Sequence, residues 1–521
     1  MKLIKVEINK YKSFSKTQSV DLGEEITVLV GKNESGKTAF LEALAKTNYF
    51  EEDDNFKFDV TNDYPRNGLS QYKKTGKVEP VITCTYVLTP SDKKKLEDNL
   101  GSGVFKHDTF SITTKYDNGT LWTIGNANEE QYLKNLPDSY ELSSELSKQI
   151  ASCKTVKAAF EFCSSYSGEE DISDVKSDLD NILKNCYDWD EKLKGYIAKS
   201  ILKPLIPKFW YFDEYYELLG EIDLKELQEN RLSDEYAKTA KALFDLAGIN
   251  IKELISSEKF EEFKAQLEST SNEITDQIFE YWKTNSNLDI QFDIQKERVT
   301  QNHNYPFEKI VLHVRIYNRK HRLSLPLSNR SKGFNWFFSF IVWFSKIQSS
   351  QDKNFILLLD EPGLNLHASA QEDLLRFIED LSQNYQIIYT THSPFMIQSD
   401  HLERVRTVYD GEGGSVISEA IQEKDPNTLF PLQAALGYDI GQNLFVSKNN
   451  LLVEGVSDLT FLTILSSVLE QAGRESLNPK ITIVPCGGLE KVPMFISLLR
   501  GSKLNIACLL DSYSIPISEN Q

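Results

Sequence analysis

The chain has 521 residues, of which 26% are charged, and a formal net charge of −19, a size that allows two or three domains with large cores. That net charge excludes diffuse attraction to nucleic acid, so any DNA contact needs a local basic patch such as "RIYNRKHR", residues 315–322, which is equally consistent with an exposed hairpin turn. The six cysteines form no C-x-x-C pair, no apolar run reaches the ~18 residues of a membrane span, and the amino terminus lacks a secretory pattern, so we expect a cytoplasmic protein without zinc, disulfides or membrane contact.

The first elements in chain order are strands that lead into a glycine-rich turn. The sequence "ITVLV" at residues 26–30 predicts a buried strand, and a helix is predicted from about residue 35 to 46. Between them, "GKNESGKT" fits the phosphate loop G-x-x-x-x-G-K-[ST], in which backbone N–H groups surround the phosphates of ATP, the lysine contacts the β and γ phosphates and the hydroxyl binds Mg²⁺. The candidate nucleotide ligands are therefore Gly31, Asn33, Gly36, Lys37 and Thr38, with Thr38 also on the metal.

A predominantly helical segment follows at residues 139–285, where runs such as "EKFEEFKAQLESTSNEITDQIFEYW" have helical spacing and many charges. One predicted strand, "KFWYFDEY" at residues 208–215, interrupts it. The segment lacks sustained heptads, so we predict a compact helical dimerisation domain rather than a long coiled coil, although its apolar faces are equally consistent with the core of a single chain. It separates two parts of one domain, residues 1–138 and 286–425.

Three further motifs complete a nucleotide site in the second of these parts. The strand "FILLLDEP" ends in Asp360, which suits the Mg²⁺ shell, and Glu361, which can polarise the attacking water. The strand "QIIYTTHSP" ends in His392, which can reach the γ phosphate, although a lone histidine is more often structural. In "LSNRSKGFNWFFSF", Ser331 and Gly333 stand at the start of an apolar helix, a geometry that suits an anion.

Residues 426–521 have the order β-α-β-α-β, which predicts a parallel sheet whose reactive groups gather at the carboxyl ends of the strands. Glu454, after "LLV", and Asp511, after "LNIACLL", stand at such ends and can share a hard divalent cation, which Asp458 could join through water. Asp458 also lies in the first turn of a predicted helix, where any acid is favourable. An apolar strand that ends in Glu454 buries a charge that needs a partner.

The order phosphate loop, Ser-x-Gly helix start, Asp-Glu-Pro strand and strand-terminal histidine resembles the ATP-binding-cassette ATPase heads related to SMC proteins. In that family the Ser-x-Gly signature of one head completes the ATP site of another, so the resemblance implies a homodimer or a higher homo-oligomer. The carboxyl-terminal segment resembles the Toprim domain, in which a strand-end glutamate and an Asp-x-Asp strand end hold Mg²⁺ for phosphodiester chemistry. Here Tyr513 replaces the second aspartate, so a second metal needs another acid.

The combination, over "GKNESGKT", "RSKG", "LLLDEP", "TTHSP" and "LLVEG", resembles the OLD family of ATP-dependent endonucleases. The implied fold is an α/β ABC-type head with an inserted helical domain and a Toprim-like domain that stops early. The implied function is an ATP-binding, Mg²⁺- or Mn²⁺-dependent DNA endonuclease of defence against phage, gated by ATP-driven head dimerisation. Family members act alone or with partners, some beside a retron reverse transcriptase and its DNA–RNA product. The alternative is an ATPase sensor or scaffold that binds a partner protein or nucleic acid and whose Toprim site is inactive.

Overall fold

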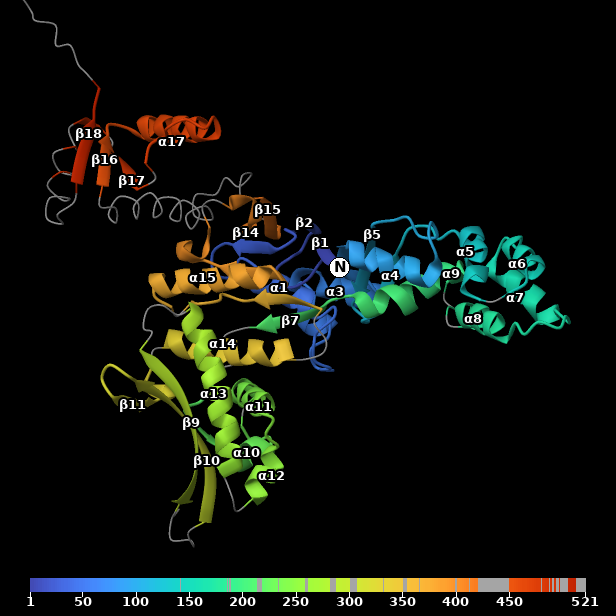
Figure 1. The fold of residues 1–521 in the computed structure, drawn as a ribbon, viewed down its shortest axis with the longest axis horizontal. Coiled ribbons are helices and arrows are strands. Elements are labelled where there is room, and N and C mark those ends of the chain that lie inside the picture. Colours follow the sequence, from blue (N-terminus) through green and yellow to red (C-terminus); the bar gives the residue numbers. More distant parts are fainter. Residues whose placement is uncertain are drawn as a thin grey trace, which may run out of the picture. The chain divides into compact units, whose positions relative to one another are not determined.

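The computed structural model forms two compact units, residues 1–396 with 401–429 and residues 397–400 with 430–521 (Figure 1). No helix among the described residues is long and apolar enough to cross a membrane. The described residues are 1–140, 142–184, 186, 189–212, 218–232, 234–257, 261–281, 287–299, 307–330, 332–349, 354–364, 366–398, 401–411, 413–419, 449–478, 480–486, 488–489, 492, 496 and 505–511.

The core of the first unit is a six-stranded sheet in the order β15-β14-β3-β13-β12-β7. All neighbouring pairs are parallel except β14 and β15. The strands β3, β12 and β13 are buried along their whole length, as expected for apolar strands covered on both faces. Their carboxyl ends meet at one edge, which brings together the motifs that follow them. The strands are β3 (Ile26–Val30), β7 (Lys208–Phe212), β12 (Phe355–Leu359), β13 (Gln386–Thr391), β14 (Val405–Gly411) and β15 (Gly414–Glu419).

An antiparallel sheet in the order β2-β1-β4-β5-β6 forms the second layer of this unit. The helix α1 (Lys37–Ala45) packs against strands of both sheets, and seven of its nine residues are buried. The predicted helix after the phosphate loop is thereby confirmed. The strands of this layer and its short helices are β1 (Lys2–Ile8), β2 (Gln18–Asp21), β4 (Pro80–Val87), β5 (Thr109–Lys115), β6 (Thr120–Thr123), α2 (Val60–Asp63), α3 (Arg66–Thr75) and α4 (Pro90–Leu100).

The helices between the two halves of the head form two groups, because β7 returns to the central sheet and pairs in parallel with β12. Figure 1 shows α5 to α8 of the first group in teal and the second group in green. The first group is α5 (Glu129–Asn135), η1 (Leu136–Ser139), α6 (Ser144–Ala151), α7 (Val156–Ser165), α8 (Ser173–Lys184), α9 (Lys192–Tyr196), η2 (Ile197–Leu202) and η3 (Lys203–Leu205). The second is α10 (Leu224–Gln228), α11 (Asp234–Leu246), α12 (Ile251–Ser256) and α13 (Glu261–Tyr281).

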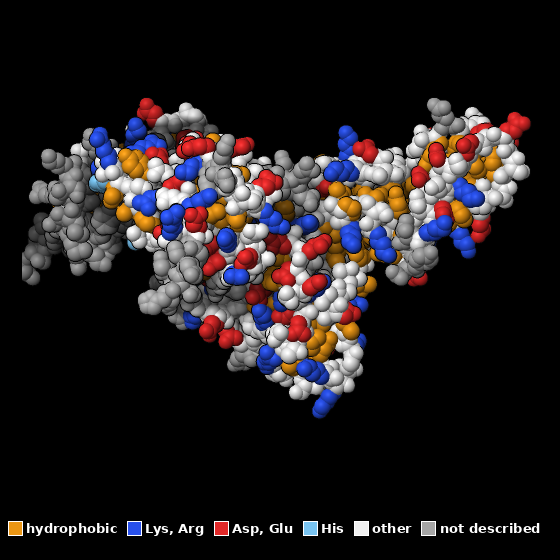
Figure 2. Space-filling view, turned by 90° about the horizontal axis from the view of Figure 1, so that it is seen from below, with side chains coloured by type: hydrophobic (Ala, Val, Ile, Leu, Met, Phe, Trp, Pro, Cys, Tyr) orange, Lys and Arg blue, Asp and Glu red, His pale blue; other side chains and the backbone are white. Residues whose placement is uncertain are grey.

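A third sheet joins the second helical group, with β10 (Phe307–Asn318) between β11 (Leu323–Pro326) and β8 (Glu221–Asp223), and with β9 (Leu288–Val299) also paired to β10. The basic segment 315–322 forms the end of β10 and the turn into β11. There Arg319 makes an ion pair with Asp289. Over the face drawn in Figure 2, basic and acidic side chains are interspersed. The remaining elements are η4 (Leu327–Asn329), α14 (Lys332–Ser349), α15 (Ala368–Ser382), η5 (Pro394–Met396) and η6 (Leu402–Arg404).

The second unit contains a parallel three-stranded sheet in the order β17-β16-β18, as the β-α-β-α-β pattern predicts. Its described elements are β16 (Asn449–Val453), α17 (Val456–Gln471), β17 (Ile481–Pro485) and β18 (Asn505–Leu509). The second helix predicted in this segment, near residues 489–501, lies mostly outside the described residues.

Candidate functional site

The phosphate loop connects β3 to α1 and has the backbone that its glycines allow. Gly36 has a φ of +109°, a left-handed conformation that favours glycine. A Cβ at Gly31 would lie 2.0 Å from the carbonyl oxygen of Val408, so only glycine fits there. Asn33 and Thr38 are exposed and can reach a ligand. A cavity of about 280 Å³, lined by Gly36, Lys37 and Thr38 among others, opens beside the loop and can receive phosphates.

The lining of this cavity includes an ion pair that sequence analysis did not identify. Lys12 forms an ion pair with Glu42 of α1, and both residues line the cavity. The Tyr11 hydroxyl donates to the same carboxylate at 3.4 Å. Burial is the largest cause that raises the pKa of Tyr11, followed by the nearby Glu42 and Asp63 carboxylates, so its hydroxyl stays a neutral donor. The cavity is therefore lined by the Lys12 ammonium as well as by Lys37.

Lys37 is buried, with 4% of its side chain exposed, and is held by three acceptors. Its Nζ donates to the carbonyl oxygens of Gly31 and Lys32, both at 3.0 Å, and lies 3.1 Å from Oε1 of Glu361. The lysine of the phosphate loop and the glutamate after β12 are therefore in direct contact, as the meeting of two parallel strand ends predicts. An arriving γ phosphate must displace Glu361 from Lys37.

His392 contacts the other oxygen of the same glutamate. Its Nδ1 lies 2.9 Å from Oε2 of Glu361, and its backbone N–H donates to that atom at 3.2 Å. About 40% of the histidine side chain is exposed, so the ring can also reach a ligand. Glu361 has a φ of +47°, an uncommon conformation for a residue with a side chain. Lys37, Glu361 and His392 form one continuous polar chain.

Asp360 is fixed by two hydroxyls that sequence analysis missed. The Tyr211 hydroxyl of β7 donates to Oδ2 at 3.1 Å, and the Thr390 hydroxyl of β13 donates to Oδ1 at 2.6 Å. Thr390 also accepts the backbone N–H of Glu361 at 2.7 Å. The sequence did offer an indication of Thr390, which is a polar residue near the end of a buried strand, two residues before His392. A carboxylate oriented in this way suits a magnesium ligand.

The predicted signature serine, Ser331, lies outside the described residues. Gly333 is described and is buried in the first turn of α14. Gly333 takes no part in the described contacts of Lys37, Asp360, Glu361 and His392.

In the second unit, the parallel register places Glu454 and Asp511 at the same edge of the sheet. Val453 pairs with Leu509, so Glu454 follows β16 directly and Asp511 stands two residues beyond β18. The Oε2 atom of Glu454 is buried, whereas Asp511 is exposed. Two carboxylates at adjacent strand ends fit the oxygen ligands that Mg²⁺ and Mn²⁺ take.

The third predicted ligand, Asp458, has another contact. Its Oδ2 accepts the backbone N–H of Gly455 at 2.8 Å, so it caps the amino terminus of α17. Within the described part of the chain, no group of three or more His, Cys, Asp or Glu side chains could hold a metal ion. Tyr513 lies outside the described residues. A full metal shell at this edge therefore needs a ligand in addition to Glu454 and Asp511.

Comparison with known proteins identifies two domains. The AAA ATPase domain family matches residues 1–397, and the TOPRIM domain of proteins like the overcoming lysogenization defect protein matches residues 445–512. The OLD nuclease of Thermus scotoductus is 26% identical over 218 residues, which cover 40% of this chain and 40% of that protein. The retron Vc95 probable ATPase of Vibrio cholerae is 20% identical over 425 residues, which cover 78% of this chain and 73% of that protein.

Among solved structures, an SMC head bound to the C-winged helix domain of ScpA covers 80% of this chain and 98% of that chain, at 13% identity and a TM-score of 0.38. This chain spans less than half the length of the OLD nuclease that it matches. The predicted resemblance to the OLD family and the predicted fold class, an ATPase head followed by a TOPRIM domain, are confirmed.

Proposed function

This chain belongs to the AAA ATPase domain family over residues 1–397, and from that premise we propose that it hydrolyses ATP and uses the head to control a metal-dependent DNA nuclease in its TOPRIM domain. The observation that carries the ATPase half is the polar chain from Lys37 through Glu361 to His392. It supplies a phosphate ligand, a general base and a group that orients the base.

In the proposed ATPase cycle, the γ phosphate replaces Glu361 as the anionic partner of Lys37. The freed carboxylate keeps its hydrogen bonds from His392 and accepts a proton from the attacking water. Thr38 and Asp360 would hold Mg²⁺, and the hydroxyls of Tyr211 and Thr390 keep Asp360 aimed at it.

In the proposed nuclease, Glu454 and Asp511 would hold a divalent cation, Mg²⁺ or Mn²⁺. Such a cation, when bound, would supply an activated water and a Lewis acid for the leaving oxygen. The support is the shared strand edge of the two carboxylates and the TOPRIM match over residues 445–512. The same proposal includes head dimerisation, in which Ser331 and Gly333 of a second copy complete each ATP site. It also includes DNA as the substrate and a role in antiviral defence in the cytoplasm. The likeness to a retron ATPase supports a retron reverse transcriptase as partner.

The alternative function is an ATPase sensor that binds a partner and has an inactive TOPRIM site. Tyr513, which stands where a Toprim domain has its second aspartate, favours it. Expression of Lys37→Ala and Glu454→Ala variants in phage-challenged cells separates the two functions. Loss of protection in both variants supports the nuclease, whereas protection that needs Lys37 but not Glu454 supports the sensor.

The ATPase half has its own test. Phosphate release from ATP is expected for wild type and for Glu454→Ala, and a loss of at least 100-fold is expected for Lys37→Ala. Equal rates for wild type and Lys37→Ala would contradict the assignment.

A further inference from the structure

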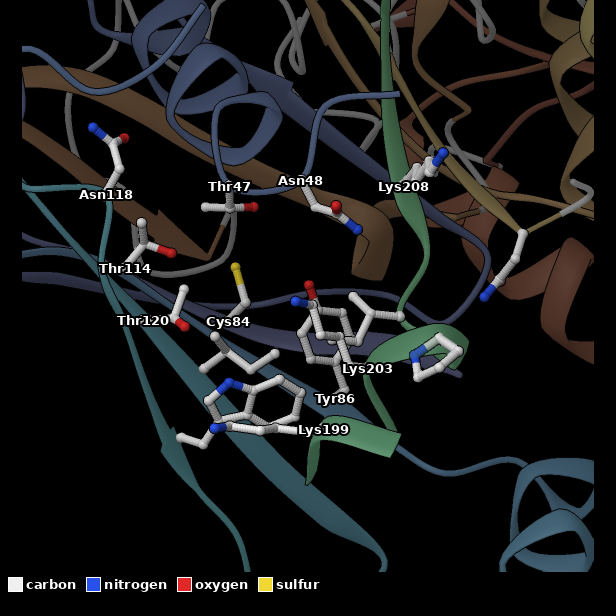
Figure 3. Close-up of a pocket in the computed structure, with 15 residues that line it drawn as sticks. Thr47, Asn48, Cys84, Tyr86, Thr114, Asn118, Thr120, Lys199, Lys203 and Lys208 are labelled. Atoms are coloured by element: carbon white, nitrogen blue, oxygen red, sulfur yellow. The ribbon is translucent and has the colours of Figure 1, made fainter. Parts of the chain in front are cut away.

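A second cavity, of about 620 Å³, lies within the first unit between the β4–β5–β6 face and the chain that runs from η2 to β7 (Figure 3). Its volume falls in the range of small-molecule sites. Ten of its lining residues are labelled in Figure 3, with Thr114, Asn118 and Thr120 on the side of the strands and the lysines on the green segment opposite. None of the residues described above for ATP or for a divalent metal lines it.

The charge of this cavity is one-sided. Lys199, Lys203 and Lys208 line it, and none of the 15 lining residues is Asp or Glu. The chain as a whole carries 77 acidic and 58 basic residues, so a lining with three lysines and no acid departs from its composition. Three lysines and no acid in the lining of a recess favour an anion, and lysine is a common ligand of phosphate.

The backbone that presents these lysines is unusual. Lys199 belongs to a six-residue π-helix, η2, and Lys203 opens the 3₁₀-helix that follows it directly. π-Helical turns are rare and are frequently found at functional sites. Lys199 and Lys203, four residues apart, both line the cavity.

The opposite wall offers flat and polar surfaces. Trp122 lines the cavity and stacks on Phe110 at 5.8 Å and 7°, and Phe110 stacks on Tyr86 at 5.5 Å and 25°. This aromatic ladder fixes the indole before any ligand binds. Thr114, Thr120 and the other polar side chains beside it can donate to and accept from a ligand. A recess with ammonium groups on one side, and an aromatic ring with hydroxyls on the other, matches a phosphate joined to a planar base.

The cavity also adjoins two segments, the end of α1 and the start of β7, that lead to residues of the candidate ATP site. Thr47 and Asn48, which line it, follow α1, the helix that begins at Lys37. Lys208 begins β7, the strand whose Tyr211 holds Asp360. Phe209 donates its N–H to the Asn48 carbonyl at 2.8 Å, so the two segments are joined at the cavity. A ligand there would contact both segments that position the ATP site.

From these observations we propose that this cavity is a second, regulatory site for a small phosphorylated ligand, a nucleotide, with its phosphate on Lys199, Lys203 and Lys208 and its base beside Trp122. The site is distinct from the phosphate loop. It goes beyond the proposed function, because it needs neither ATP hydrolysis nor DNA cutting.

The test is calorimetric titration of the full chain, as wild type and as Lys37→Ala, with the four ribonucleoside monophosphates, pyrophosphate and orthophosphate as probes. At least one monophosphate is expected to bind both proteins with equal affinity and at least tenfold more tightly than orthophosphate. The double variant Lys199→Ala/Lys203→Ala should bind that monophosphate at least tenfold more weakly. The matched control is Lys148→Ala, which replaces an exposed lysine of α6 outside the cavity and should leave the affinity for the monophosphate unchanged.

A second measurement distinguishes loss of ligand binding from misfolding of the variants. Ligand binding should change tryptophan fluorescence in wild type, and the change should be lost in Trp122→Phe while the thermal transition stays in place. The proposal is overturned if no probe binds with a Kd below about 1 mM, or if binding survives the double lysine substitution. A single-stranded oligonucleotide is titrated in the same way, and the proposal is also overturned if it alone binds, because the recess would then be part of a nucleic-acid path.

Discussion

Replacing Glu361 by Gln tests whether this residue both restrains Lys37 and acts as the general base. The substitution keeps the shape of the side chain and an oxygen that can accept from His392. It removes the negative charge that lies 3.1 Å from the Lys37 ammonium. The contact is shielded from solvent, since only 4% of the Lys37 side chain and 17% of the Glu361 side chain are exposed.

The size of the effect follows from that shielding. A hydrogen bond to a charged group contributes about 1.5–3 kcal/mol, and ATP must break this one to reach Lys37. Taking the lower value, ATP should bind the Glu361→Gln variant about tenfold more tightly than wild type. Hydrolysis should fall about 10²–10⁴-fold because the base is lost. The free energy of unfolding without nucleotide should fall by about 1–3 kcal/mol, because the buried ammonium loses its anion.

The assay measures equilibrium binding of a fluorescent ATP analogue and phosphate release on the same samples. The matched control is Glu379→Gln, a partly buried glutamate of α15 that contacts Arg404 rather than Lys37, and it should hydrolyse ATP within a few-fold of wild type. Weaker or unchanged nucleotide binding by Glu361→Gln would refute the restraint of Lys37. Hydrolysis at the wild-type rate would refute the general base.

Three further outcomes are expected. Tyr211→Phe removes the hydroxyl that donates to Asp360 at 3.1 Å, so half-maximal ATP hydrolysis should need about tenfold more Mg²⁺; an unchanged metal titration would show that the hydroxyl is only structural. Asp458→Asn keeps an oxygen that can cap α17 but loses the charge, so both the thermal transition and DNA cutting should persist, and loss of cutting alone would instead make Asp458 a metal ligand. Burial raises the pKa of the Cys84 thiol to about 12, so at pH 8 only about 10⁻⁴ of it is thiolate; in timed iodoacetamide labelling followed by mass spectrometry, exposed Cys508 should react first, and equal rates would contradict the burial of Cys84.

The sequence predicted which residues of the candidate ATP site come together where a motif stands at the end of a buried strand. Lys37, Asp360, Glu361 and His392 follow strands whose apolar runs were evident, and parallel pairing then brings them to one edge. Tyr211 was missed because its role depends on β7 lying beside β12, a neighbour relation that no local pattern encodes.

The second cavity was missed for a similar reason. Its lysines come from η2, η3 and the start of β7, and its other wall comes from residues that precede them by about 80 or more positions in the chain. In the TOPRIM domain, the parallel pairing of the strands was predictable from the alternation of strands and helices. The use of Asp458 as a cap was one of two alternatives that spacing alone left open.

Cutting of supercoiled plasmid DNA tests the central claim most directly. The full chain should nick or linearise the plasmid in Mg²⁺ or Mn²⁺ and not in EDTA, and Glu454→Gln should abolish cutting while ATP hydrolysis stays at the wild-type rate. A wild-type chain that hydrolyses ATP but never cuts, or a Glu454→Gln variant that cuts as fast as wild type, would contradict the claim that this protein is an ATP-controlled nuclease.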